Sequence, residues 1–264
     1  EVILGLPGAT YENHIQTLRD LVKAKMDEIV VHTCMLLDGS EMNVPEERKK
    51  WDLKTKFRVL QRDFAKLNSG KKVLEYEEVV VGSKTMTFEE YINLRILAFV
   101  IFVTNRGIVY DSILKFLDEN KIDVFELYYE MYKNLKNASI QTQEIVEKFK
   151  KATIEELWDS PEELLENFEK DSEYEKLLNG EAGTQVIYHY LAVVISEGMD
   201  DWTEHVIQTT SNLIKKRPEF NEDLESEFKS VTNFARGLSH NVLGEDRLET
   251  NPEYYFMYDI PRWL

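Results

Sequence analysis

Cysteine is nearly absent from the sequence: Cys34 is the single one among 264 residues. One cysteine cannot form an internal disulfide, and by itself it cannot build a Cys-ligated zinc site or an iron–sulfur cluster. The simplest setting is therefore a reducing, cytoplasmic one. Long apolar runs are also missing, because the longest, Ile96–Val103, has eight residues and a membrane-spanning helix needs about 20. We expect no membrane segment, and no secretory or transit signal is recognisable.

Positive charge is scarce as well, with 32 Lys and Arg against 49 Asp and Glu and a net charge of −17. This balance argues against nucleic acid or anionic lipid as a partner. The charge is uneven: residues 46–72 hold ten basic and four acidic residues, whereas residues 151–181 hold three basic and eleven acidic ones. We expect the basic island to dock on the acidic region; the alternative is that it neutralises an acidic substrate or cofactor group.

The first 37 residues predict one strand–helix–strand unit. Val2–Leu6 reads as a strand that is apolar on both faces, as in a parallel sheet covered by helices. Thr10 can cap the following helix, whose apolar stripe is Ile15, Leu18 and Val22. Ile29–Leu37 reads as a second buried strand. Two parallel strands need such a helical crossover between them.

The first strand begins at once, with no polar arm before it, so one of its edges would be bare. We therefore expect the chain to be a piece of a larger enzyme. We also expect the edge of residues 2–6 to be covered, either by a second copy of the chain in a homo-oligomer or by the aromatic segment 254–264 folding back on it.

The remainder of the chain reads as a connecting segment and then helices. Val73–Val81 predicts one further strand, which Gly82 ends, and Thr87 with Glu90 matches the capping box that begins a helix. Helical periodicity continues to about residue 241, with helices expected at 87–105, 108–119, 122–136, 140–151, 161–178, 184–196, 202–214 and 224–238.

The fold class is therefore mostly α with a small α/β part. Three consecutive regions are expected along the chain. Residues 1–44 form the strand–helix–strand unit, residues 45–86 a basic connecting segment with one strand, and residues 87–264 a helical-bundle domain that ends in an aromatic, strand-like tail.

One stretch of sequence resembles a known superfamily. Ile3-Leu4-Gly5-Leu6-Pro7-Gly8-Ala9-Thr10, then a helix, then a buried strand ending Leu36-Leu37-Asp38-Gly39-Ser40-Glu41, resembles the last third of the radical SAM (β/α) barrel, where a late strand carries a pattern like IxGxPGET. The likeness is to cobalamin-binding members such as the anaerobic magnesium-protoporphyrin IX monomethyl ester cyclase. The segment from Lys54 to Tyr91 is similar to the one that leads into the helical C-terminal region of these enzymes.

The departures from this family are specific. The CxxxCxxC motif that binds a [4Fe–4S] cluster is absent, Ala9 stands where relatives usually carry Glu, and no cobalamin-binding domain is present. The resemblance therefore implies the downstream fragment of an iron–sulfur oxidoreductase. Its partners would be the rest of the parent chain and a small-molecule substrate. The fragment itself would hold no cofactor, no metal and no catalytic residue, and we expect it to be inactive.

The resemblance also implies where S-adenosylmethionine (SAM) lies in the parent enzyme. Ile3, Gly5, Leu6 and Pro7 would line the adenine side of SAM, and the parent would cleave SAM reductively to a 5′-deoxyadenosyl radical; the sequence leaves open whether it uses cobalamin. The alternative interpretation is that Gly5, Pro7 and Gly8 only make the strand-to-helix turn.

Other candidate residues have weaker patterns. Cys34 lies in a buried strand, where a cysteine is usually an inert small hydrophobe. His32 on the same strand either points toward a ligand or hydrogen-bonds to backbone beneath a helix. His189 and His205 fall on different predicted helices without an HxxxH pairing, so a metal site is not expected.

Two rival functions stay open. One is a stand-alone helical binding or scaffold protein without catalysis, and the other is a piece of a barrel enzyme unrelated to SAM. The bare first strand counts against the scaffold. The unrelated barrel enzyme is disfavoured because the sequence shows no paired catalytic carboxylates and no histidine cluster that could catalyse a reaction.

Overall fold

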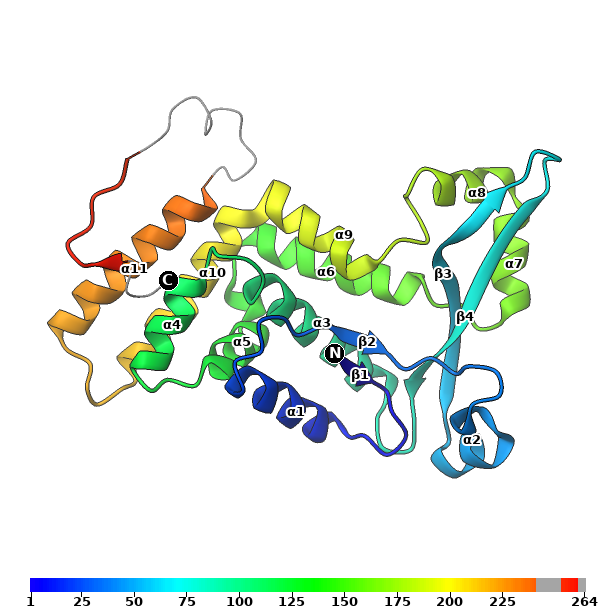
Figure 1. The fold of residues 1–264 in the computed structure, drawn as a ribbon, viewed down its shortest axis with the longest axis horizontal. Coiled ribbons are helices and arrows are strands. Elements are labelled where there is room, and N and C mark those ends of the chain that lie inside the picture. Colours follow the sequence, from blue (N-terminus) through cyan, green and yellow to red (C-terminus); the bar gives the residue numbers. More distant parts are fainter. Residues whose placement is uncertain (241–252, 261–264) are drawn as a thin grey trace. The chain divides into compact units, whose positions relative to one another are not determined.

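The computed structural model describes residues 1–240 and 253–260 (Figure 1). The described chain is mostly helical and carries two small two-stranded sheets. The prediction of a mostly α fold with a small α/β part is confirmed in this form, whereas the assignment to a radical SAM barrel stays a prediction. No helix among the described residues is both long and apolar enough to cross a membrane.

The chain divides into two compact units, each built from three separate segments. The first unit contains Glu1–Thr17, Val30–Ile96 and Lys148–His189. The second contains Leu18–Ile29, Leu97–Glu147 and Tyr190–Leu264. The three consecutive regions expected from the sequence stay a prediction, and periodicity alone does not reveal which distant segments share a core.

The expected strand–helix–strand unit is present. Strand β1 (Val2–Leu4) pairs in parallel with β2 (Val31–Thr33), and helix α1 (Tyr11–Lys23) connects them. The cap on α1 is also confirmed, since the backbone N–H of Asn13 donates to Thr10 Oγ1 at 3.1 Å. Both strands are shorter than the sequence predicts, because Gly5 turns the chain after β1 and the residues after β2 leave it for another strand.

The structure differs most from the sequence-based prediction between residues 41 and 82. The sequence predicts one strand in a basic connecting segment, whereas the structure has a 3₁₀ turn η1 (Glu41–Asn43), a helix α2 (Pro45–Trp51) and a long antiparallel hairpin of β3 (Lys54–Lys66) and β4 (Lys72–Gly82). The apolar residues of β3 alternate with Lys and Arg, which hid the strand. Met35 bridges to Val79 of β4, so the hairpin adjoins the end of β2.

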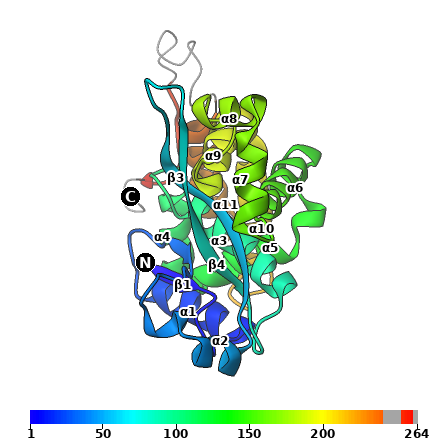
Figure 2. The same cartoon turned by 90° about the vertical axis from the view of Figure 1, so that its right-hand side faces the viewer.

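Two short helices cover one face of the hairpin. Figures 1 and 2 show α7 (Pro161–Glu169) and α8 (Asp171–Leu178) beside β3 and β4. Their contact is an apolar cluster of Val59, Leu164, Phe168, Tyr174 and Leu177. The sequence predicts a single helix over 161–178; the structure breaks it at Lys170, whose extended backbone ends α7 and begins α8.

Three further helices contribute segments to this unit: α3 (Phe88–Thr104), α6 (Ile140–Glu155) and α9 (Val186–Val193). The predicted capping box at the start of α3 is confirmed. The N–H of Thr87 donates to the Glu90 carboxylate at 2.7 Å, and the N–H of Glu90 donates to Thr87 Oγ1 at 3.2 Å. As expected, Ile96–Val103 is buried throughout.

The second unit is a helical bundle. It contains α4 (Asp111–Glu119), α5 (Val124–Lys133), the 3₁₀ turn η2 (Leu135–Asn137), the π-helical turn η3 (Val194–Gly198), α10 (Met199–Lys215) and α11 (Glu222–Ser239). Helix α10 packs against α5 and α11, and α11 packs against α4. Trp202 anchors this core: its ring meets Phe99 edge-on, and its Nε1–H donates to Thr104 Oγ1 at 3.1 Å.

The aromatic C-terminal segment is not a strand over residues 253–260, contrary to the sequence-based prediction. Tyr254 packs against Gly237 of α11, and Phe256 meets Phe234 edge-on. The segment contacts the bundle only in part, because Phe256 is half-buried whereas Tyr254 and Tyr255 remain 49% and 90% exposed. Residues 261–264 of the predicted tail lie outside the described residues. The covering of the β1 edge stays a prediction.

Candidate functional site

The four residues assigned to the SAM adenine lie at the end of β1 and in the turn after it. Ile3 and Leu6 are 46% and 39% exposed, whereas Gly5 is buried. Val2 and Leu4 exchange hydrogen bonds with β2, so the backbone N–H and C=O of Ile3 point to the opposite edge. An exposed apolar side chain beside free backbone donors and acceptors is compatible with a wall for a flat base.

Gly5 and Gly8 also have purely structural roles. Gly5 has φ +93°, and a Cβ on it would lie 2.9 Å from the carbonyl oxygen of Val80 in β4. Gly8 has φ +82°, and a Cβ there would lie 3.0 Å from the Trp51 ring. The turn interpretation of these glycines is thus supported by their backbone and neighbours.

His32 in β2 and Cys34, which directly follows that strand, are placed differently. His32 pairs in register with Ile3 and shares its exposed face, with 54% of its side chain exposed and the Glu1 carboxylate 3.7 Å away. It is therefore not beneath a helix. Cys34 is buried as the sequence predicts, and burial raises the pKa of its thiol, so it remains protonated and unreactive.

A groove of about 950 Å³ lies in the first unit, and we call it the hairpin groove. Its walls come from β2, from β3 and β4, and from residues 177–189. His32 and His189 both line it, although the sequence separates them by more than 150 residues and predicts no relation between them. Sequence reasoning missed the groove because it missed β3, which supplies much of the wall.

Two residues that line this groove, Arg58 and Glu77, belong to a buried ion network that also includes Glu156. Arg58 Nε lies 2.5 Å from Glu77 Oε1, and Arg58 Nη1 lies 3.0 Å from Glu156 Oε1. The three side chains are only 13%, 10% and 18% exposed. Burial alone would lower the pKa of Arg58, but the carboxylates of Glu156 and Glu77 outweigh it, so the pKa is raised and the guanidinium stays charged.

The basic island does dock on the acidic region. Besides Arg58 with Glu156, three cross-region ion pairs join the two stretches: Lys56 with Asp159, Lys66 with Glu175 and Lys72 with Asp171. The expectation from the charge pattern is therefore confirmed. Arg62 differs from these residues, because no ion pair joins it to any described residue.

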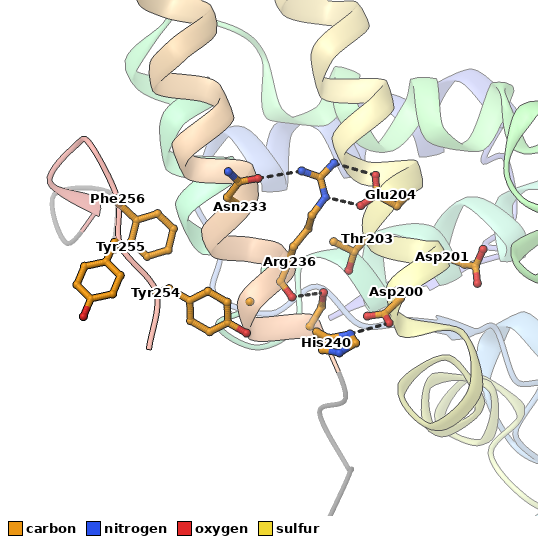
Figure 3. Close-up of a pocket in the computed structure, with 12 residues that line it drawn as sticks. Asp200, Asp201, Thr203, Glu204, Asn233, Arg236, His240, Tyr254, Tyr255 and Phe256 are labelled. Atoms are coloured by element: carbon orange, nitrogen blue, oxygen red, sulfur yellow. Dashed lines mark hydrogen bonds and ion pairs between the residues drawn. The ribbon is translucent and has the colours of Figure 1, made fainter. Parts of the chain in front are cut away.

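The second unit holds a separate pocket of about 630 Å³ between α10, α11 and residues 254–256 (Figure 3). Arg236 binds Glu204 through two nitrogens at 2.5 and 2.9 Å, and His240 Nδ1 lies 3.1 Å from Asp200. The hydrogen bond from Arg236 lowers the pKa of Glu204. These charges pair with each other in an exposed setting, so the arrangement reads as surface packing rather than as a reactive centre.

No group of three or more His, Cys, Asp or Glu side chains within residues 1–240 and 253–260 is placed to hold a metal ion. A comparison with protein-family models and with curated proteins found no match for the chain.

Two buried histidines predict a pH-dependent stability. His14 is 4% exposed, its Nε2 has no partner among the described residues, and burial lowers its pKa to about 4. His205 is 7% exposed; burial lowers its pKa, and its hydrogen bond to the Met131 carbonyl only partly opposes this. Below about pH 6.5 these histidines are protonated in the unfolded chain but stay neutral in the folded chain. The free energy of unfolding therefore falls as the pH drops.

We expect the lowered pKa of His14 alone to reduce the free energy of unfolding by about 1.4 kcal/mol when the pH falls from 7.5 to 5.5. Urea unfolding at the two pH values measures this, and His14→Gln should reduce the pH dependence by that amount. An unaltered pH dependence in His14→Gln would contradict the assignment.

Proposed function

We propose that this chain is the downstream part of a radical SAM enzyme. The observation that carries the proposal is the run Ile3–Thr10, which occupies a strand, a turn and a helix start within a parallel strand–helix–strand unit. Ile3, Gly5, Leu6 and Pro7 would border the adenine of SAM. Ile3 supplies exposed apolar surface, and its outward backbone groups supply hydrogen bonds to a base edge.

The iron–sulfur cluster does not fit this chain. Cys34 is the one cysteine and is 2% exposed, so no cluster ligand set exists here. In the proposed parent protein the cluster would be bound by another part of the chain and would supply the electron that cleaves SAM. The contribution of the present residues is to shape one side of the adenosine site and to keep it close to β4.

The decisive experiment uses the full reading frame that contains this chain. We expect a CxxxCxxC motif about 80–150 residues upstream of Glu1, from the usual length of barrel repeats. The reconstituted full-length protein with dithionite should release 5′-deoxyadenosine from SAM, and the present chain alone should not. A reading frame without the three cysteines, together with no 5′-deoxyadenosine, would refute the proposal and favour a helical binding or scaffold protein.

A variant of the full-length protein tests the proposed wall directly. Ile3→Asp places a charge on the exposed face of β1 and should lower SAM cleavage at least tenfold while the iron content stays the same. Ile140→Asp is the matched control, because Ile140 is an exposed isoleucine (77%) in the second unit. Equal activity of the two variants would place the adenine elsewhere.

A further inference from the structure

We propose that the hairpin groove binds a small molecule that has an apolar body and a carboxylate head, with Arg62 as the partner of the carboxylate. This inference goes beyond the proposed function and stands on the groove alone. All residues that line the groove belong to the first unit. Its volume of about 950 Å³ is at the upper end of ordinary ligand pockets.

The charge of the groove singles out Arg62. Strand β3 carries five cations, and four of them are paired with carboxylates: Lys54, Lys56, Arg58 and Lys66. Arg62 is the fifth, and no described carboxylate pairs with it. The one acidic residue that lines the groove is Glu77, which Arg58 already engages. The groove therefore presents a positive charge in a chain whose net charge is −17.

The backbone at Arg62 is unusual in a way that fits a binding role. Its φ is +67°, which an arginine adopts at a cost that glycine or asparagine would largely avoid. It lies where the β3–β4 register shifts between Val59 and Phe64. Such bulges re-aim side chains, and they are frequent beside functional sites. The hairpin thus carries an arginine at this position although its backbone conformation is unfavourable for that residue.

The rest of the groove offers apolar surface. Met35, Leu178 and Tyr188 are 40%, 43% and 39% exposed although they line a concavity, and Leu60 and Phe64, which line it too, are half-buried. Exposed apolar side chains gathered in a hollow favour an apolar ligand body. A guanidinium favours a planar oxyanion, which it can bind through two parallel hydrogen bonds. Together these features select a carboxylate-bearing amphiphile.

The test uses the full chain and four ten-carbon probes: decanoate, decyl phosphate, decanol and decyltrimethylammonium. Displacement of a fluorescent anilinonaphthalene sulfonate gives the affinities, with the charged probes kept below their micelle concentrations and decanol below its solubility limit. We expect decanoate to bind at least tenfold more tightly than decanol and than the cationic probe. Equal binding of all four probes would overturn the proposal, and tighter binding of decyl phosphate would overturn the choice of carboxylate.

Variants locate the head and the body of the probe. Arg62→Gln should weaken decanoate at least fivefold without changing decanol, and Arg62→Lys should lie between. Met35→Ala should weaken decanoate and decanol alike. Lys71→Gln, at the exposed hairpin tip outside the groove, is the control and should match the parent chain. Unchanged decanoate binding in Arg62→Gln, with circular dichroism like that of the parent, would refute the assignment. Because SAM is absent, this result is independent of the proposed radical chemistry.

Discussion

Arg58→Met should lower the free energy of unfolding of the first unit by about 3–5 kcal/mol. The substitution keeps most of the side-chain volume but leaves the carboxylates of Glu77 and Glu156 buried without their cation, at side-chain exposures of 10% and 18%. The loss of a partner in a buried ion pair is costly because the remaining charge stays desolvated. Urea unfolding monitored by circular dichroism measures the change, with each unit treated as a separate transition.

Two further variants separate the effect of unpaired buried charge on the free energy of unfolding from the effect of lost side-chain contacts. Arg236→Met removes a bidentate pair whose side chains are 42% and 56% exposed, and it should cost about 1 kcal/mol or less. The triple variant Arg58→Met, Glu77→Leu, Glu156→Leu should recover most of the loss, because no charge remains buried. If Arg58→Met and Arg236→Met cost the same, the Arg58 network is more hydrated than its burial indicates, and the prediction is wrong.

Gly5→Ala should destabilise the first unit by about 2–4 kcal/mol, the sum of an overpacked contact and a left-handed backbone. A Cβ at Gly5 would lie 2.9 Å from the carbonyl oxygen of Val80, which is a backbone atom of β4 and cannot swing aside. The same substitution would push the turn after β1 away from the hairpin, so it should also weaken any ligand site built on both.

Gly39→Ala is the matched control. Gly39 has a similar φ of +78°, but a Cβ there would meet nothing within 4 Å, so only the backbone cost of about 1 kcal/mol should appear. Thermal and urea unfolding of the two variants give the difference, which isolates the close approach of β4. Equal destabilisation would mean that β4 does not approach Gly5 in solution.

The features that were predictable from the sequence are local ones. The Thr10 cap, the Thr87–Glu90 capping box and the parallel unit of β1, α1 and β2 each depend on residues close together in the chain, so their pattern is readable before folding. Burial of Cys34 and of Ile96–Val103 follows from continuous apolar runs. The docking of the basic island was predictable because ten basic residues lie in one stretch of the sequence and eleven acidic residues in another.

The hairpin was not predictable in the same way. In β3 the apolar residues Phe57 and Val59 are interleaved with Lys56 and Arg58, which read as a solvated segment. Lys56 pairs with Asp159, and Arg58 pairs with Glu77 of β4 and with Glu156; Asp159 and Glu156 lie about 100 residues further along the chain. Strand pairing and burial of the charges therefore depend on each other, and no local sequence pattern predicts either of them.

By itself, the sequence determined the helical class, the beginnings of α1 and α3, the parallel βα start and the motif on which the proposed function rests. These are set by short-range hydrogen bonds and by the periodicity of apolar residues. Only the tertiary structure decided that His32, Arg62 and His189 line one groove, that Gly5 lies against Val80, and that no carboxylate of the described residues pairs with Arg62. These relations are long-range: they depend on which distant segments pack together.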